Sequence, residues 1–381
     1  MTKIYLIRHA EAEGNLYRRI QGHWDGRVTP RGERQIDALA ERFRGTAIDA
    51  LYSSDLQRTR ETAGAITRYH DLEVHVTPRL REINMGAWEG RPWGNAEHET
   101  PEQMYFFNHD PDRWSIPGCE SFPAVQQRMQ RVLSELAAQH EGQTIAVVSH
   151  GMAIRAYLCA VLGVASADIP QVPHGDNTAV ACIVYETGVP RVEFYNDNSH
   201  LPPELSTFGR QTWWKSTDQD LGNLRFQPMR FPRDAEFYTR CYADAWRAAH
   251  GSEEGFVAAP YLRSARQHAK TPDAVMKVLS GDRVAGMIEL DPARCSEEAC
   301  GWISFFYLLP EYRSRGWGVQ LLGHAIWFFE TGARRAIRLH VATENAHALG
   351  FYEHYGFRRV GSSEGVRGTL YLMEKPIESH C

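Results

Sequence analysis

The sequence lacks several features that would place it in a special class of proteins. No apolar run approaches the roughly 20 residues needed to cross a bilayer, and the strand-like start at Lys3–Ile7 does not have the layout of a signal peptide. Neither sign of charge dominates: the net charge of −5 gives no reason to expect nucleic acid or an anionic membrane as a partner. Internal repeats are also absent. We therefore expect a soluble globular protein whose basic residues act in local clusters.

Cysteine is scarce and scattered. The closest pair, Cys295 and Cys300, does not have the spacing of zinc ligands and has no second pair to complete a site. We expect mostly reduced, buried thiols, a cytoplasmic location and no metal centre. The seven cysteines are Cys119, Cys159, Cys182, Cys241, Cys295, Cys300 and Cys381.

The length of 381 residues is too great for one ordinary core and indicates two domains. In residues 1–197, apolar strands such as Thr144–Ser149 alternate with helical stretches such as Arg31–Arg44, which favours an α/β sandwich around a largely parallel sheet. Residues 198–220 contain Pro202-Pro203 and few aliphatic side chains, so we predict a linker there. Residues 221–381 have a different order of elements, including a hairpin, and form a predicted α+β unit.

Two polar clusters follow directly on predicted strands. Arg8-His9-Ala10-Glu11 comes at the end of the first strand, and Ser149-His150-Gly151 follows a later one. Ligands of open α/β sheets bind at the carboxyl ends of strands, near the starts of helices. Either histidine alone is as readily a structural residue, but the two together indicate a shared site.

Four motifs occur one after another in the N-terminal half of the chain. They are the Arg8–Glu11 cluster, residues 53–63, the stretch 80–90 with Arg81-Glu82, and Ser149-His150-Gly151. Together they resemble the histidine phosphatase (phosphoglycerate mutase-like) superfamily over about residues 1–195. The resemblance implies an α/β sandwich of phosphoglycerate mutase-like type and a reaction at a phosphoryl group.

The resemblance also implies roles for individual residues. His9 matches the nucleophile, which would form a phosphohistidine that water then hydrolyses. Arg8 and Arg58 match the phosphate clamp, since arginine forks suit phosphate better than lysine does, and His150 matches the second histidine. Glu82 would protonate the leaving alkoxide and later accept a proton from water, with no metal in any step. The further expected contacts to the phosphoryl group are Asn15, Gln21 and Gly151.

Two residues depart from the family pattern. Ala10 stands where glycine is usual, which narrows the room near the backbone, and Ala12 stands where threonine is common, which removes a hydroxyl. Neither is a principal catalytic group. After Glu82, the stretch Ile83–Gly86 matches the phosphatase branch, whereas mutases have an Arg-His-Tyr stretch and a longer insertion. The lid, Arg91–Gly118, is rich in aromatic residues, which suits either a broad pocket or core packing.

A second site is indicated in the C-terminal half. Arg313–Gly318 follows a strand and opens a helix, so its glycines and amides suit close approach by an anion. With Asn345 and the stretch Gly350–Phe357 downstream, this segment resembles the GNAT acetyltransferase family over about residues 221–381. The resemblance implies an α+β GNAT (acyl-CoA N-acyltransferase) fold and acetyl-CoA as cosubstrate.

In that family the turn holds the CoA pyrophosphate and the preceding strand runs along the pantetheine arm. Tyr352 matches the tyrosine that protonates the departing thiolate, although it also suits a core position. The general base stays open between Glu289 and a chain of water molecules, and so does the identity of the acceptor amine. The expected cofactor-binding residues are Leu309, Arg313, Ser314, Arg315, Gly316, Trp317, Gly318 and Asn345.

The leading hypothesis is a bifunctional enzyme that hydrolyses a small phosphomonoester without metal and transfers an acetyl group from acetyl-CoA to an amine. One alternative is a phosphoglycerate mutase-like isomerase in the N-terminal half. Another is a C-terminal half that binds CoA as a sensor without catalysis. Oligomeric state and both substrates lie beyond what these patterns predict.

Overall fold

The structure is a computed structural model that describes residues 1–211, 222–366 and 368–377. It divides into two units, Met1–Asn223 and Leu224–Cys381. Within the described residues, the six cysteines present are unpaired, and four of them are buried.

The first unit is built on a six-stranded sheet in the order β3-β2-β4-β1-β5-β6. Strands β1 to β4 are parallel to one another, and β5 and β6 form an antiparallel hairpin at the β1 edge. The largely parallel sheet agrees with the prediction, but the sequence analysis did not identify the hairpin. The strands are β1 (Thr2–Arg8), β2 (Ala50–Ser53), β3 (Val74–Val76), β4 (Thr144–Ser149), β5 (Val180–Glu186) and β6 (Val189–Asp197).

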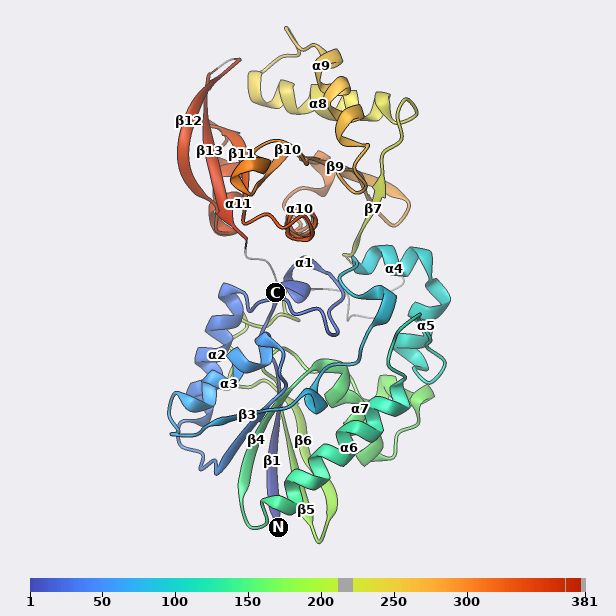
Figure 1. Ribbon diagram of the computed structural model, residues 1–381, viewed down its shortest axis with the longest axis vertical. Coiled ribbons are helices and arrows are strands. Elements are labelled where there is room, and N and C mark those ends of the chain that lie inside the picture. Colours follow the sequence, from blue (N-terminus) through green and yellow to red (C-terminus); the bar gives the residue numbers. More distant parts are fainter. Residues whose placement is uncertain (212–221, 367, 378–381) are drawn as a thin grey trace. The chain divides into compact units, whose positions relative to one another are not determined.

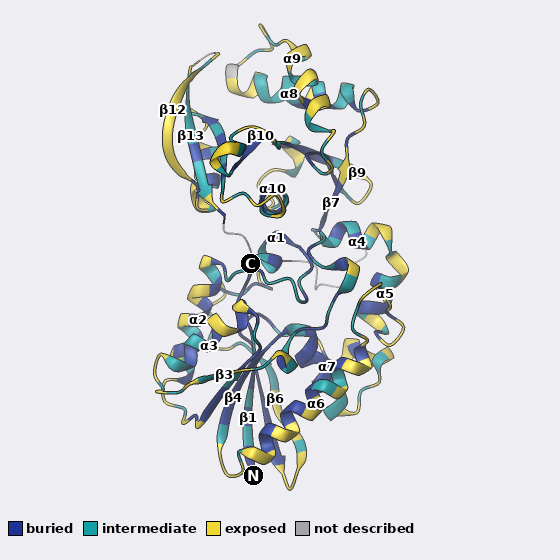
Figure 2. Ribbon diagram, viewed as in Figure 1, coloured by how far each residue is buried: buried dark blue, intermediate teal, exposed yellow. Residues whose placement is uncertain are grey.

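Helices cover both faces of this sheet (Figure 1). In β4, Ile145 and Val147 pack with residues of the helices α6 and α7, while Ala146 and Val148 pack with those of α2 and α3. Successive residues of a strand point to opposite faces, so a strand covered on both sides is apolar throughout. Figure 2 shows the resulting burial of the central strands β1 and β4. These helices are α2 (Pro30–Phe43), α3 (Gln57–Thr67), α6 (Phe122–Gln139) and α7 (Gly151–Leu162).

The start of α2 follows its sequence signals. The hydroxyl of Thr29 accepts a hydrogen bond from the amide of Gly32, and Pro30 takes the first helical position, where its missing amide proton is not needed.

The predicted lid contains two short helices, α4 (Trp93–Glu99) and α5 (Pro101–His109). Phe107 of α5 packs against Trp88 and Trp114 with ring centroids 6.0 and 5.1 Å apart. All three are buried, so core packing accounts for these aromatic residues. The remaining short elements are α1 (Glu13–Tyr17) and the 3-10 turns Pro78–Leu80, Gly86–Trp88 and Ser166–Gln171.

The expected linker lies partly within the first unit. Leu205 and Thr207 are buried, and residues 198–211 run along the edge of the sheet where β1 ends. The structure therefore places these residues with the phosphatase-like unit, and residues 212–220 of the expected linker lie outside the described residues. The composition of this segment did not indicate these contacts, because they join it to residues more than 150 positions earlier in the chain.

The second unit has a seven-stranded sheet in the order β12-β13-β11-β10-β9-β8-β7. Its pairings are antiparallel except for that of β10 with β11. The predicted hairpin is present between β8 and β9, with its turn at Gly281 and Asp282. The strands are β7 (Leu224–Pro228), β8 (Val275–Ser280), β9 (Arg283–Asp291), β10 (Cys300–Leu308), β11 (Ala336–Ala342), β12 (Arg358–Gly365) and β13 (Gly368–Pro376).

Helices α8 (Ala235–His250) and α9 (Ala258–His268) cover one face of this sheet, and α10 (Gly318–Thr331) and α11 (Ala346–His354) the other (Figure 1). The helix predicted to begin after Arg313–Gly318 is α10, whereas the sequence analysis did not predict α9 or β12. Two 3-10 turns, Ser296–Glu298 and Pro310–Tyr312, complete the unit.

Candidate active sites

His9 and His150 lie side by side at one edge of the first sheet. Arg8 at the end of β1 is in register with Ser149 at the end of the parallel strand β4, so the next residue of each chain segment emerges at the same edge. The two imidazole rings have centroids 5.3 Å apart. The structure thus brings together the two histidines that the strand ends had singled out.

The imidazole of His9 is held through its Nδ1 atom. Its Nδ1 lies 2.7 Å from the carbonyl oxygen of Ala10, which can only accept a hydrogen bond, so Nδ1 carries the proton. Burial lowers the pKa of His9 well below its ordinary value of 6.5, and the positive charges of Arg58 and Arg8 lower it further. The ring is consequently neutral at neutral pH, with the lone pair on Nε2.

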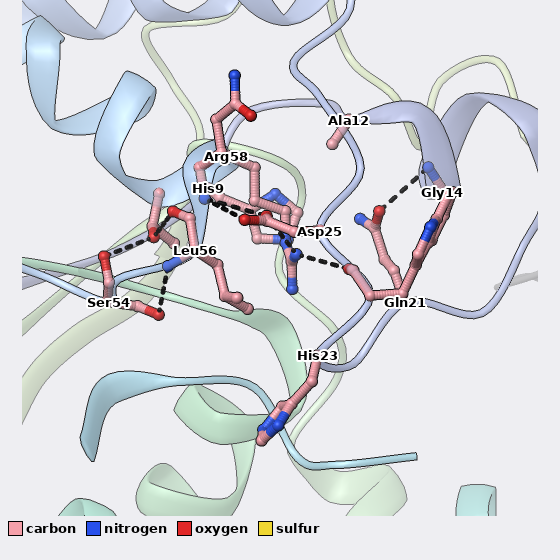
Figure 3. Close-up of polar contacts among 12 residues, drawn as sticks. His9, Ala12, Gly14, Gln21, His23, Asp25, Ser54, Leu56 and Arg58 are labelled. Carbon is pink, nitrogen blue, oxygen red and sulfur yellow. Dashed lines mark hydrogen bonds and ion pairs between the residues drawn. The ribbon is translucent and has the colours of Figure 1, made fainter. Parts of the chain in front are cut away.

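Arg58 is fully buried, although it belongs to a charged stretch of α3. Its Nη2 donates to the carbonyl oxygen of Gly22 at 2.8 Å, and its Nη1 donates to that of Trp24 at 3.1 Å. Nη1 also lies 3.4 Å from Oδ1 of Asp25 (Figure 3). The turn at residues 22–25 therefore holds the guanidinium in one orientation beside His9.

Arg8 is fixed from a different loop. Its Nη1 donates to the carbonyl oxygen of Gly175 at 2.5 Å. A Cβ at Gly151 would stand 3.2 Å from Nε of Arg8, so a glycine keeps the space beside this guanidinium open.

Three buried nitrogen atoms of this cluster are left without a hydrogen-bond partner among the described residues. They are Nε of Arg8, Nε of Arg58 and Nδ1 of His150. Buried polar groups of native proteins are nearly always paired, so unpaired donors in a cationic cluster mark a place suited to an anion.

His150 follows β4 and occupies the position before the first residue of α7. Its Nε2 lies 2.9 Å from the hydroxyl oxygen of the buried Ser54. If the Ser54 hydroxyl donates to Nε2, the imidazole proton is on Nδ1, where it is available as a donor. Burial, followed by the charge of Arg58, lowers the pKa of His150 well below 6.5.

The carboxylate of Glu82 sits at the start of α7. Its oxygens accept hydrogen bonds from the amides of Met152 at 3.0 Å and Ala153 at 2.8 Å, two of the free amides of the first helical turn. A third comes from the amide of Ile83 at 3.0 Å. Burial lowers the pKa of Arg58, and the charges of Asp25 and Glu82 act against that lowering.

Asn15 lies in the short helix α1, and Gln21 lies in the loop that follows it. The side-chain oxygen of Asn15 accepts from the amide of Ala12 at 3.0 Å. The side-chain oxygen of Gln21 accepts from the amide of Gly14 at 3.1 Å (Figure 3). The two side chains are 3.4 Å apart. Asn15 also lies 3.4 Å from the side-chain nitrogen of Asn177, which donates to the carbonyl oxygen of His9.

The two departures from the family pattern are accommodated locally. Ala10 is fully buried, and its amide donates to the hydroxyl of Thr62 at 2.9 Å. Ala12 is also buried at the start of α1, where Asn15 supplies the polar contact to its amide. Neither alanine displaces Arg8, His9 or Arg58 from the cluster.

In the second unit, β10 and β11 are paired over a short stretch only. The parallel pairing joins Cys300–Trp302 to Ala336–Arg338, although β10 continues to Leu308 and β11 to Ala342. The register of β10 against β9 shifts between Ile303 and Phe305, and β10 and β11 part beyond that point. Parting strands leave backbone groups that an extended ligand can bind.

The turn that leads into α10 has the backbone of an anion site. Ser314 and Gly316 have positive φ values of 59° and 75°, so successive amides turn toward the helix start. In the described part of the chain, no side chain caps α10. Arg315 stacks over Tyr312 and Trp317 at 5.6 and 5.5 Å from their ring centroids. These features fit the pyrophosphate of CoA.

Other expected cofactor residues have structural partners. The amide of Leu309 donates to the carbonyl oxygen of Ala285 at 2.9 Å, and Nε of Arg313 donates to that of Leu308 at 2.8 Å. Asn345 caps α11, its side-chain oxygen accepting from the amide of Ala348 at 3.0 Å. A Cβ at Gly318 would come within 3.1 Å of the ring of Phe351, so glycine is needed for packing there.

Tyr352 is buried on α11 against Phe306 of β10, with ring centroids 5.8 Å apart. Phe306 lies beyond the point where β10 and β11 part. Burial raises the pKa of the Tyr352 hydroxyl, so this group keeps its proton at neutral pH.

Glu289 of β9 is buried beneath α8 and α9. Its Oε2 accepts hydrogen bonds from the hydroxyls of Tyr238 at 2.7 Å and Tyr242 at 2.9 Å, and its Oε1 lies 2.8 Å from Nδ1 of His268. Nε2 of His268 lies 3.2 Å from Asp291. Glu289 is paired with Phe305, next to the register shift in β10. The buried carboxylate is therefore close to the point where β10 and β11 part, as a general base would have to be.

Family models agree with both sites. The model described as "Histidine phosphatase superfamily (branch 1)" matches residues 4–198, just over half of the chain. The chain belongs to the histidine phosphatase superfamily. A second model, "Acetyltransferase (GNAT) family", matches residues 235–357, so this histidine phosphatase carries a GNAT domain in the same chain.

Relatives of the phosphatase domain have two kinds of name. "Phosphoserine phosphatase 1" of Hydrogenobacter thermophilus is 37% identical over 164 residues, which is 43% of this chain and 78% of that protein. "Probable phosphoglycerate mutase GpmB" of Proteus mirabilis is 39% identical over 166 residues, covering 43% and 76%. The solved structure of Bacillus stearothermophilus YhfR has a TM-score of 0.51 and 29% identity, covering 52% of this chain and 99% of that one. The names of these relatives include both a phosphatase and a mutase, so they do not distinguish hydrolysis from phosphoryl transfer within one molecule.

Sequence reasoning missed a polar loop of the histidine phosphatase domain. The side-chain amide of Asn177 donates to the carbonyl oxygen of His9 at 3.0 Å, and the amide of Thr178 lies 3.3 Å from the same oxygen. The loop precedes β5, which runs antiparallel to β1, so its amino end lies at the edge where β1 ends. The polar run Asp176-Asn177-Thr178 before an apolar stretch was the available signal.

Two further observations concern the described residues alone. No helix there is both long and apolar enough to span a bilayer. No group of three or more acidic, histidine or cysteine side chains there is arranged to hold a metal ion.

Proposed function

We propose that the chain is a bifunctional enzyme that hydrolyses a small phosphomonoester through a phosphohistidine and transfers an acetyl group from acetyl-CoA to an amine. One observation carries the first activity. A neutral His9 imidazole lies among Arg8, Arg58 and His150, three side chains with unpaired buried nitrogen atoms in the described structure.

In the first step, Nε2 of His9 attacks phosphorus in line with the ester oxygen. The P–N bond forms as the P–O bond to the leaving group breaks. Arg8 and Arg58 neutralise the charge on the remaining phosphoryl oxygens, and the uncharged His150 donates a hydrogen bond from Nδ1, a task that preorganised donors perform at low dielectric. Asn15 and Gln21 add neutral contacts from the loop above.

Glu82 transfers protons in both steps. As a carboxylic acid it protonates the departing alkoxide, and as a carboxylate it then removes a proton from the attacking water. Water adds to phosphorus as the P–N bond breaks, which releases inorganic phosphate and restores neutral His9. All the charge stabilisation in this scheme comes from side chains, so we expect turnover in the presence of a chelator.

Hydrolysis is favoured over phosphoryl transfer within a sugar acid by the segment after Glu82. Ile83 and Met85 are buried there, in place of the basic and aromatic stretch expected of a mutase. The relatives named as mutases keep the isomerase as the second candidate. Product analysis separates the two, because a mutase conserves organic phosphate and needs a phosphorylated primer.

In the acetyltransferase half, the turn at Ser314–Gly318 would bind the pyrophosphate of acetyl-CoA, and the stretch of β10 that is not paired with β11 would orient its pantetheine arm. Tyr352 would donate the proton that the departing thiolate takes up. Glu289, with His268, is the candidate that accepts a proton from the amine, either directly or through water. The competing function is a CoA sensor, which binds acetyl-CoA but releases no CoA across an amine panel.

The deciding experiment measures phosphate release from a panel of phosphomonoesters in EDTA for the wild type and His9→Ala. Turnover that is lost in a folded His9→Ala protein supports the phosphohistidine mechanism. Turnover that survives His9→Ala, or that requires an added metal, contradicts it. CoA release should be the same in the two proteins, since the two sites are proposed to act independently.

A further inference from the structure

The segment expected to be a linker makes an unusual set of contacts with the phosphatase site. Residues 198–211 follow the last strand of the first sheet, and Thr207 within them is 1% exposed. Its hydroxyl lies 3.2 Å from Oε2 of Glu11 and 3.1 Å from the side-chain nitrogen of Gln35. Gln35 also donates to the carbonyl oxygen of Leu205 at 2.8 Å.

These contacts lead directly to the backbone beside the nucleophile. The side-chain oxygen of Gln35 accepts a hydrogen bond from the amide of Glu11 at 2.7 Å. Because the nitrogen of Gln35 is held by Leu205 and Thr207, its oxygen is directed to Glu11 and not away from it. Glu11 is two residues from His9, so the segment fixes the chain that carries the nucleophile.

A second line of contacts reaches the loop before β5. The hydroxyl of Ser206 donates to Oδ2 of Asp176 at 2.6 Å, and the amide of Phe208 lies 3.4 Å from Oδ1 of the same carboxylate. The side chain of Asn198 adds a contact at 3.3 Å. Asp176 thus obtains most of its donors from residues 198–211.

That loop holds both a clamp arginine and the nucleophile. Gly175 accepts the hydrogen bond from Nη1 of Arg8, and Asn177 donates to the carbonyl oxygen of His9. The ring of Phe208 lies 5.9 Å from the guanidinium carbon of Arg8. At the far end of the segment, the side chain of Gln211 donates to the carbonyl oxygen of Asn15 at 2.9 Å.

We infer that residues 198–211 are part of the phosphatase active site, in which Thr207 and Ser206 position the nucleophile loop and the Arg8 loop. The inference rests on the proposed phosphatase activity. The two hydroxyls act through Glu11, Gln35 and Asp176 and touch neither the substrate nor His9. Their loss lets the attacking Nε2 of His9 drift from its line with the ester bond, and displacements of about 1 Å can lower rates on the order of 100-fold.

The test compares four variants of the full chain with the wild type, using p-nitrophenyl phosphate as the probe. Thr207→Val keeps the shape of the side chain and removes its hydroxyl, whereas Thr207→Ser keeps the hydroxyl. Ser206→Ala removes the hydroxyl that donates to Asp176. Glu204→Gln is the matched control, because Glu204 is an exposed residue of the same segment. Circular dichroism establishes that each variant is folded.

We expect Thr207→Val and Ser206→Ala to lower kcat by about 10- to 100-fold while KM changes by less than about threefold. Thr207→Ser should return kcat to within about threefold of the wild type, and Glu204→Gln should match it. The inference is overturned if both hydroxyl deletions keep kcat within about twofold, or if folded Thr207→Ser is as slow as Thr207→Val.

A second readout separates this inference from the proposed function. Amide hydrogen exchange at residues 9–15 should become at least about tenfold faster in Thr207→Val and stay unchanged in Glu204→Gln, whether or not the probe is hydrolysed. A wild-type chain without turnover on any phosphomonoester would contradict the proposed function alone. Unchanged exchange in Thr207→Val would overturn the positioning role alone.

Discussion

Arg58 and Arg60 project from the same helix, α3, into opposite environments. Arg58 is fully buried beside His9 and bonded to the turn at residues 22–25, whereas Arg60 is exposed. Arg58 is thus placed to contact a phosphoryl group, whereas Arg60, two residues later in the same helix, is a surface residue. We expect Arg58→Ala to lower the kcat of phosphate release by about 100- to 1,000-fold, the effect of removing one preorganised donor from an oxyanion site.

The matched control is Arg60→Ala, which should stay within about twofold of the wild type because it removes no contact to the site. Steady-state phosphate release measures both variants. Equal losses in the two would show that the helix as a whole, and not the buried guanidinium, supports the activity.

The pH dependence of the phosphatase follows from the state of His9. Burial and the neighbouring arginines hold the pKa of His9 well below 6.5, so the imidazole stays neutral as the pH falls through that value. The measurement is kcat/KM as a function of pH on a phosphomonoester whose own pKa is known. As the pH falls, kcat/KM should not decrease with a midpoint near pH 6.5. A decline centred there, after correction for the substrate, would mean that His9 titrates normally.

The same shift affects stability. A histidine whose pKa is lowered on folding binds its proton more readily in the unfolded chain, so the unfolding free energy should be fully present above pH 6.5 and fall below it. His9→Asn should reduce this acid sensitivity. His150 is lowered in the same direction by burial and Arg58, so part of the sensitivity should remain in that variant.

Acetyl-CoA binding can be tested at two glycines of the second unit. Gly316 has a φ of 75°, where a branched side chain is strained and also obstructs the backbone amides of the turn. We expect Gly316→Val to weaken acetyl-CoA binding by at least about tenfold, equivalent to about 1.4 kcal/mol, in isothermal titration calorimetry. Phosphatase turnover should be unchanged.

Gly350 provides the control for that substitution. It is exposed within α11, and a Cβ there would meet open space among the described residues. Gly350→Ala should leave binding unchanged and stabilise the helix by up to about 1 kcal/mol. If Gly316→Val binds acetyl-CoA as well as Gly350→Ala does, the turn is not the pyrophosphate site.

The His268–Glu289 pair predicts an opposite pH response in the second unit. Burial lowers the pKa of His268, but the hydrogen bond and charge of Glu289 and the charge of Asp291 outweigh it and raise the pKa overall. Stability from a raised histidine pKa is fully present below the unfolded value of 6.5 and is lost as the pH rises through the folded value. The unfolding midpoint of the second unit should therefore fall with rising pH above 6.5.

Thermal unfolding of the full chain at several pH values measures this midpoint, with His268→Gln as the comparison. The variant should lose the alkaline sensitivity, because glutamine does not titrate. A wild-type midpoint that is flat between pH 6 and 9 would contradict the raised pKa of His268.

Much of the first site could be predicted because its residues follow strands. The carboxyl ends of parallel strands meet at one edge, so Arg8, His9 and His150 were placed together by the alternation of apolar runs and helices. The residues contributed by β5 were harder to predict. This strand is antiparallel to β1, so the loop at the site comes before the strand and not after it. Asp176 and Asn177 were therefore missed, although they reach the same edge.

Glu289 shows a similar division. The sequence made it a candidate base, but nothing local to it indicates Tyr238 or His268, which come from two different helices. The helix α9, which carries His268, was itself not predicted. Long-range polar partners depend on how helices dock on the sheet, and that docking is not encoded in the spacing of neighbouring residues.

The sequence by itself determined that the chain has two units, which residue types stand at the ends of their strands, and which turn has the glycines for an anion, because these depend on local pattern and backbone geometry. Only the tertiary structure decided that Arg58 is buried, that Glu82 sits on the first turn of α7, and that residues 198–211 hold the loops beside His9. The physical reason is that burial and hydrogen-bond partners arise from contacts between segments far apart in the chain. Such contacts form only when the sheet and its helices have assembled.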